Sequence, residues 1–172
     1  AGKSCVQVFF YRSKQNWGNQ SYFPSHDKSH TAEEVLASFV TQFYENKNVP
    51  AEILLNKKIK DLSLVKAALE KKEKKFISIK IPTKGNASKL SKMAEKNAKE
   101  ALTRKIFESE TNIKLLDQIA DKFKLNISPR TIEVYDNSHI HGSNSVGALI
   151  TFGSEGFVKK QYRKFNIKNK EL

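Results

Sequence analysis

Cysteine is nearly absent from this chain of 172 residues, which contains only Cys5. A single thiol excludes an internal disulfide framework, and it excludes any zinc or iron–sulfur site built from several cysteines of the chain. We therefore expect a reducing compartment, the cytoplasm. Cys5 lies in an apolar segment with no base close in sequence, so we expect it to be a buried structural thiol rather than a nucleophile.

Long apolar runs are absent as well. No stretch is long and apolar enough to span a membrane, and the first residues lack the apolar core and cleavage pattern of a signal peptide, so no membrane partner is expected. The hydrophobic content of 38%, with 11 Phe, predicts a globular chain with one core, or one core and a small appended unit. The abrupt start suggests a piece of a longer protein.

Acidic residues are scarce beside basic ones. The chain has 18 Asp and Glu against 31 Lys and Arg, a net charge of +13, which favours a polyanionic partner such as nucleic acid. The segment 57–105, called the basic block below, contains 16 basic and five acidic residues. It forms either solvated helix faces, the usual case, or a surface that follows phosphates.

Several common site motifs are missing. The sequence has no P-loop and no G-x-G-x-x-G pattern, and Gly153 with Gly156 is typical of a turn between strands. His26 and His30 are spaced for one face of a helix, but they lack the glutamate of an H-E-x-x-H site and precede the expected helix cap. We therefore do not expect that pair to bind metal.

The first 82 residues predict alternating elements. Two β-rich runs, 5–11 and 19–23, predict a hairpin whose turn contains Gly18. Thr31 and Glu34 match the capping-box pattern at the start of a helix that runs to about residue 46. A short strand at 52–56, a helix capped by Asp61 and a strand at 76–82 follow; in the last, Ile77, Ile79 and Ile81 share one face.

The rest of the chain predicts one long helix and a small sheet. From about 87 to 125 there is no Gly or Pro, so we expect a helix that bends near 108–112 or joins two domains. Three antiparallel strands, 131–136, 145–152 and 157–167, follow Pro129. The expected fold class is α/β: a hairpin and alternating helices and strands around a mixed sheet in domain 1–125, and three antiparallel strands in domain 130–172.

Asp136 is the most unusual residue of the sequence. It lies in the run IEVYDNSHIHG, and a lone carboxylate in a half-buried strand is costly unless it is paired, hydrogen-bonded or bound to a metal. Ile132, Val134 and Asp136 share one face, so the carboxylate extends an apolar row to a sheet edge, which suits a Mg²⁺ ligand. The alternative, which the residues alone favour, is an Asp that caps a turn, because Asn137 and Ser138 promote turns.

The two histidines beyond Asp136 form an H-x-H pair. His139 and His141 have the opposite strand parity to Asp136, so a metal site shared by the three is not expected unless the backbone bends. We expect Ser138 and His139 to orient the loop through hydrogen bonds, and His141 to be exposed.

The last predicted strand, FVKKQYRKFNI, alternates basic and aromatic residues. This pattern suits phosphate contact beside a stacking platform, and it equally suits an edge strand that lysines protect from pairing. The candidate nucleic-acid-binding residues are Lys159, Lys160, Tyr162, Arg163 and Lys164.

Three stretches together resemble the UvrC family of bacterial excision-repair nucleases. IEVYDNSHIHGSNSVGALITFGSEGFVKKQYRKFNIK looks like the opening of that family's RNase H-like endonuclease domain. CVQVFFYRSKQNWGNQSYFP and SFVTQFYEN resemble the segment before it. The resemblance implies that Asp136 is the first catalytic carboxylate and a ligand of Mg²⁺ or Mn²⁺. It also implies that the parent protein cuts damaged DNA on the 5′ side of the lesion together with UvrB, with UvrA acting upstream.

The resemblance is incomplete. The family's further acidic residue in an I-D-G-G-like strand, its later catalytic histidine, its GIY-YIG nuclease and its helix-hairpin-helix domain have no counterpart in these residues. We therefore expect this chain alone to be inactive, and its open sheet to allow self-association. Domain 1–125 could be a degenerate RNase H-like unit without an acidic set, and the alternative function is a non-catalytic nucleic-acid-binding or scaffold module.

Overall fold

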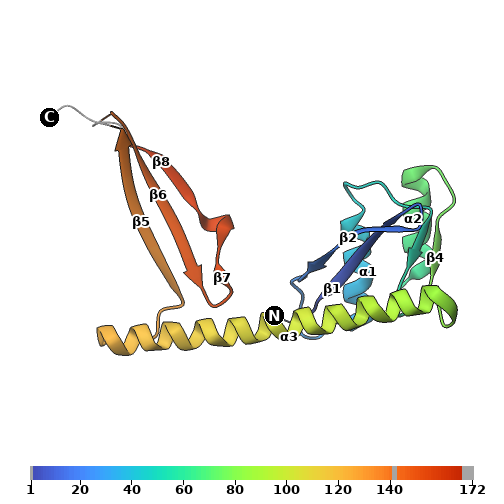
Figure 1. Cartoon of the computed structure of the whole chain (residues 1–172), viewed down its shortest axis with the longest axis horizontal. Helices are drawn as coiled ribbons and strands as arrows, with labels where there is room; N and C mark the ends of the chain where they lie inside the picture. The colour runs from blue at the N-terminus through green and yellow to red at the C-terminus, as the bar shows by residue number, and fades with distance from the viewer. Residues whose placement is uncertain (1, 141–142, 168–172) are drawn as a thin grey trace. The chain divides into compact units, whose positions relative to one another are not determined.

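The computed structural model describes residues 2–140 and 143–167, with the backbone alone at 139, 140, 143 and 144. The chain divides into two compact units, Ala1–Thr103 and Arg104–Leu172. The elements are β1 (Val6–Arg12), β2 (Gln15–Tyr22), α1 (Ala32–Phe43), β3 (Glu52–Leu54), α2 (Leu62–Glu73), β4 (Ser78–Lys80), α3 (Gly85–Phe123), β5 (Thr131–Ile140), β6 (Ser143–Gly153), β7 (Gly156–Phe157), the 3₁₀ turn η1 (Lys159–Gln161) and β8 (Arg163–Asn166) (Figure 1). The α/β class is confirmed. None of the described helices is both long and apolar enough to cross a membrane.

Strands β1 and β2 form the predicted hairpin, but its turn lies elsewhere. The two turn residues are Ser13 and Lys14, both at positive φ (48° and 63°), as a tight hairpin turn requires. The prediction that Gly18 forms the turn is wrong. Gly18, at φ 124°, lies within β2 where the register shifts between Phe9 and Tyr11, so it makes a β-bulge. Ser and Lys rarely adopt positive φ, which is why the sequence pattern points to the glycine.

The hairpin packs on α1 through aromatic rings. Phe10 and Tyr22 both contact Phe43, with ring centroids 6.4 and 5.5 Å apart, and Tyr22 also contacts Phe39 at 5.3 Å.

The capping box is confirmed: the Glu34 amide donates to Thr31 Oγ1, and the Thr31 amide donates to the Glu34 carboxylate. The start of α1 is thereby fixed by local chemistry.

Glu34 connects this helix cap to the loop before α2. Its carboxylate accepts a hydrogen bond from Lys60 Nζ at 2.8 Å, and this contact, with the Thr31 amide, lowers the pKa of Glu34 from 4.5 to about 2. Because the folded-state pKa is depressed, the stabilisation is present above pH 4.5 and is lost as the pH falls towards 2.

We expect Glu34→Gln to reduce the acid sensitivity of folding. Unfolding free energies measured by urea titration between pH 4.5 and 2 should fall less steeply in the variant than in the parent. Glu33→Gln is the matched control, since Glu33 lies in the same first turn and makes no ion pair in the described part of the chain. If the unfolding free energy fell equally steeply with pH in the parent and in Glu34→Gln, the stabilising role of the Glu34 carboxylate would be contradicted.

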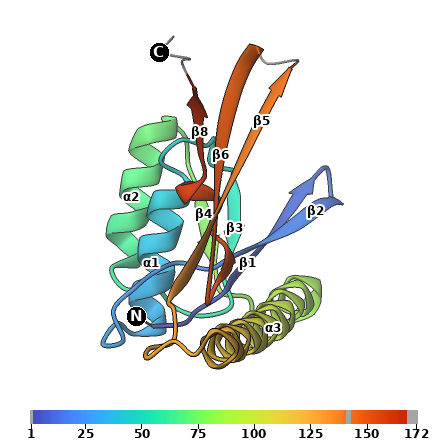
Figure 2. The same ribbon diagram turned by 90° about the vertical axis from the view of Figure 1, so that its left-hand side faces the viewer.

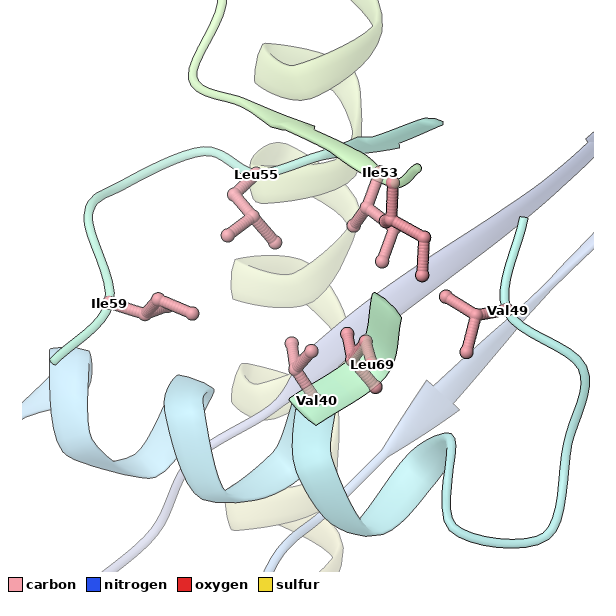
Figure 3. Packing of buried hydrophobic residues seen from close by; sticks show 7 residues of the cluster. Val40, Val49, Ile53, Leu55, Ile59 and Leu69 are labelled. Carbon is pink, nitrogen blue, oxygen red and sulfur yellow. The ribbon is translucent and has the colours of Figure 1, made fainter. Parts of the chain in front are cut away.

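Strands β3 and β4 are parallel and are joined through α2, with Ile53 opposite Ile79. Helices α1 and α2 lie side by side (Figure 2). The side chains between these elements form the core of the first unit: Val40, Val49, Ile53, Leu55, Ile59, Leu69 and Ile77 (Figure 3). The predicted alternation is confirmed here, because Ile77 is 0% exposed and its neighbour Phe76 is 73% exposed.

Asp61, His26 and Cys5 each have a distinct local environment in the first unit. Asp61 occupies the N-cap position of α2, but it is left-handed (φ 52°) and makes no capping hydrogen bond, so the predicted cap is wrong. His26 is fully engaged by its neighbours: Nδ1 donates to Asp27 O at 2.7 Å, which leaves Nε2 to accept from Ser4 Oγ at 2.8 Å. Cys5 is half-buried and not fully buried as predicted, and its partial burial raises the pKa of the thiol.

Helix α3 is continuous over 39 residues, about 58 Å of helix, which agrees with the second of the two predicted alternatives, a helix shared by two domains. The division between the units falls inside it, between Thr103 and Arg104. Its first half contacts the first unit through Ser91 Oγ, which donates to Leu55 O. Its second half contacts the β6–β7 turn, where Asn112 Nδ2 donates to Ser154 O and Ser109 Oγ donates to Glu155 Oε1.

The second unit contains a four-stranded antiparallel sheet in which β6 is central, with β5 on one side and β7 and β8 on the other (Figure 1). The third strand is not continuous as predicted. On β6, Phe152 pairs with Phe157 and Leu149 pairs with Arg163. These pairs are three residues apart on β6 but six residues apart on the segment that pairs with it. The excess residues form η1, so the strand breaks into β7 and β8.

Candidate functional site

Asp136 lies on β5 in a row of residues that crosses the sheet. It is paired with Ala148 of β6, which is paired in turn with Lys164 of β8. Directly opposed residues of antiparallel strands project to the same face, so the carboxylate and the Lys164 side chain share one face of the sheet. The predicted apolar row is also present, because Ile132 and Val134 have the same parity on β5.

This face carries few charges. The other paired positions on it are Ile132, Val134, Ser138, Val146, Ile150, Phe152, Phe157 and Asn166. Among the described residues of the sheet, Asp136 is therefore the one carboxylate on this face. Several of its apolar side chains are open to solvent: Val134 is 54% exposed and Phe157 is 65% exposed.

The Asp136 carboxylate is itself exposed. Asp136 is therefore not half-buried as predicted and needs no partner to offset burial, because its neighbours Tyr135 and Asn137 on the other face of β5 are exposed as well. The turn-capping alternative is also wrong: β5 continues through Asn137 and Ser138 to Ile140 before the hairpin reverses. What the strand provides is a solvent-accessible carboxylate on a defined face of the sheet, with no hydrogen bond or ion pair in the described part of the chain.

Asp136 could supply one oxygen ligand to a hard cation, but the described residues around it do not make up a complete metal site. Mg²⁺ and Mn²⁺ prefer carboxylate oxygens, usually one or two with water and substrate phosphate. No group of three or more His, Cys, Asp or Glu side chains that could hold a metal occurs among the described residues. Further ligands would have to come from outside this set.

The five candidate nucleic-acid-binding residues do not form one alternating strand. Lys159 and Lys160 are exposed on η1, Tyr162 is half-buried after it, and only Arg163 and Lys164 belong to β8. Arg163 Nη1 donates to the backbone oxygens of Lys160 (3.0 Å) and Tyr162 (2.8 Å), so part of its guanidinium stabilises the turn. Lys164 is the candidate that shares a face with Asp136.

The predicted loop-orienting pair is only partly described. Ser138 pairs with Val146 on the face of Asp136 and is exposed. The side chain of His139 lies outside the described residues, and so does His141.

Asn137 has a local role that the sequence analysis missed. A Cβ at Gly147 would lie 3.1 Å from Asn137 Oδ1 and 3.7 Å from Phe165 Cβ, so glycine allows Asn137 to lie close over β6. A glycine inside a strand is the signal that could have indicated this close approach. The contact is on the face opposite Asp136.

Comparisons with known proteins cover nearly the whole chain. The family described as the UvrC Ribonuclease H-like domain matches residues 1–105, and the UvrC RNAse H endonuclease domain matches residues 120–172. The chain is similar to UvrABC system protein C of Ruegeria sp. (strain TM1040), with 47% identity over 99% of this chain and 27% of that protein. It is also similar to the UvrABC system protein C of Bradyrhizobium diazoefficiens, with 50% identity over 99% of this chain and 25% of that protein.

The chain thus spans about a quarter of the length of the curated relatives it matches. A search of solved structures gave no significant match.

Proposed function

The chain belongs to the UvrC family, and on this premise we propose that it is the part of an excision-repair endonuclease that contributes Asp136 to the cut 5′ of a DNA lesion. The observation that carries the proposal is the position of Asp136: an exposed carboxylate in the paired part of β5, in the segment that matches the endonuclease domain. The partners proposed for the whole protein are damaged DNA and UvrB, with UvrA upstream, and the proposed location is the cytoplasm.

In this mechanism Asp136 serves as a ligand of Mg²⁺ or Mn²⁺. The cation, when bound, acts as a Lewis acid that polarises the scissile phosphate and lowers the pKa of a bound water. The chain's own residues orient the reaction. Strand β5 fixes the direction of the carboxylate, and Lys164, in the same row and on the same face, attracts a phosphate towards it.

Lys159 and Lys160 are proposed to contact the DNA backbone next to this row. Both are exposed on η1, which lies just before β8 in the chain. A DNA strand bound along β8 would therefore pass close to both lysines. Contacts of this kind position DNA without reading its sequence. Tyr162 and Arg163 then act mainly by holding the turn, since Tyr162 is half-buried and Arg163 donates to the turn's carbonyls.

We expect the 172-residue chain alone not to cut, and a full-length family member to cut. One carboxylate supplies one ligand, whereas Mg²⁺ requires several oxygen ligands in near-octahedral geometry. The measurement is cleavage of a lesion-bearing duplex that is preloaded with UvrB and already nicked on the 3′ side, with Mg²⁺ present.

The same reaction with the metal chelated is the control for the full-length protein. Cutting by the isolated chain at a comparable rate would contradict the proposal that ligands beyond the described residues are needed. Metal-independent cutting by the full-length protein would contradict the metal's role.

A further inference from the structure

The turn end of the β1–β2 hairpin exposes aromatic side chains beside cations. Trp17 is 64% exposed, and the Arg12 guanidinium carbon lies 5.0 Å from the centre of its ring. Lys14 occupies the turn itself and is exposed. We call Arg12, Lys14 and Trp17 the hairpin tip. The turn end of the hairpin extends away from α1 and α2 (Figure 2).

A β-bulge shapes the backbone at Trp17. The bulge at Trp17 and Gly18 re-aims the side chains of β2, and Asn16 Oδ1 accepts a hydrogen bond from the Gly18 amide at 2.8 Å. Gly18 is not required by space, since nothing lies within 4 Å of a Cβ built there. It is required by its φ of +124°. The base of the hairpin is anchored to α1 by the contact of Phe10 with Phe43.

The charge around the tip is of one sign. The first 26 residues contain Lys3, Arg12 and Lys14 and no Asp or Glu. The other exposed aromatic ring of the first unit with a cation over it, Phe76 with Lys66 at 4.4 Å, differs in this respect. It follows a helix that contains Glu70 and Glu73. The hairpin tip thus combines an exposed aromatic face with uncompensated positive charge.

We propose that the hairpin tip binds single-stranded nucleic acid. The indole of Trp17 stacks on a base, and Arg12 and Lys14 contact the adjoining phosphates. Around Trp17 the hairpin exposes polar residues, Ser13, Gln15, Asn16 and Asn19, and also the rings of Phe10 and Tyr11, which are 40% and 42% exposed. The cations Arg12 and Lys14 beside these rings favour a phosphate-bearing strand over a protein partner. The surface belongs to the first unit and does not depend on the role of Asp136.

Trp17 is the single tryptophan of the chain, so its emission reports on this surface directly. Titration of the 172-residue chain with a short oligo(dT) strand at low salt should quench the emission to a plateau, because a stacked base quenches indole fluorescence. Added salt should restore the emission as phosphate contacts are lost. Emission that stays constant while labelled oligo(dT) binds the chain would overturn the proposal.

Variants separate stacking from charge, with fluorescence anisotropy of labelled oligo(dT) as the readout. Trp17→Ala should weaken binding roughly tenfold, and Trp17→Phe should retain most of the affinity. In the double variant Arg12→Gln, Lys14→Gln, the slope of log K for binding against log salt concentration should be shallower by about 1.4, because two phosphate contacts are lost. Trp17 and both cations are exposed, so these changes leave the core intact.

Two matched controls guard against general effects. Phe76→Ala removes an equally exposed aromatic ring under a lysine, and Lys122→Gln with Lys124→Gln removes the same charge from the end of α3 and the residue after it. Both should bind like the parent. Unchanged affinity of Trp17→Ala would overturn the proposal, and so would emission changes that UvrB produces and oligo(dT) does not.

Discussion

Asp136→Asn in a full-length family member is expected to abolish the 5′ cut, slowing it on the order of a thousandfold or more, while DNA binding is unchanged. A metal ion bound at a phosphoryl centre contributes several kcal/mol of transition-state stabilisation, and each ~1.4 kcal/mol is a factor of ten in rate. The amide is nearly the same size as the carboxylate but carries no charge, so the cation is lost and the strand is kept. Single-turnover cleavage of a UvrB-loaded duplex nicked on the 3′ side measures the effect.

Glu133→Gln is the matched control for this experiment. Glu133 is another carboxylate of β5, but it has the opposite parity and faces away from the row of Asp136 and Lys164. There its carboxylate accepts a hydrogen bond from Tyr135 Oη, and its negative charge raises the pKa of that tyrosine. Cleavage should persist in this variant. An Asp136→Asn protein that cuts at the parental rate would remove Asp136 from the mechanism.

Ile77→Ala is expected to destabilise the first unit by about 2–5 kcal/mol. Ile77 is fully buried in the core cluster between the helices and the parallel strand pair, so truncation removes buried apolar surface and leaves a cavity. The backbone amide of Ile77 also donates to Glu70 Oε1, which holds the residue in position and limits relaxation into the cavity. Urea unfolding followed by circular dichroism gives the change in free energy.

Phe76→Ala provides the comparison at the adjacent position. Phe76 is larger than Ile77 but is 73% exposed, and its principal contact is with the Lys66 ammonium at 4.4 Å. Its truncation should cost no more than about 1 kcal/mol. Equal destabilisation by the two substitutions would mean that the strand's two faces are not assigned correctly.

Much of the architecture could be predicted because its causes are local. The Thr31–Glu34 capping box lies within four residues, and it appears in the structure as expected. The alternation around Ile77 and the long segment without Gly or Pro that becomes α3 are likewise short-range patterns. Residue parity on β5 followed from the strand's two-residue period alone, so the row of Ile132, Val134 and Asp136 was predictable.

The predictions that were wrong involve backbone conformations that strand register or a residue's own φ decides, and that residue chemistry alone does not indicate. Gly18 has turn chemistry, but the pairing of β1 with β2 places the turn at Ser13 and Lys14 and leaves the glycine in a bulge. Asp61 has capping chemistry, but its left-handed conformation prevents the capping hydrogen bond. The last strand breaks at η1 because its pairing with β6 has to accommodate excess residues.

The α/β class, the succession of helices and strands, the excess of positive charge and the side of β5 on which Asp136 lies were therefore all predictable from the amino-acid order. These follow from propensity, periodicity and charge, which are properties of neighbouring residues. Three features required the folded chain: the exposure of the Asp136 carboxylate, the place of Lys164 in the same row, and the exposure of Trp17 beside Arg12. Exposure and cross-strand neighbours are set by strand register and packing between distant segments, which no short stretch of sequence specifies.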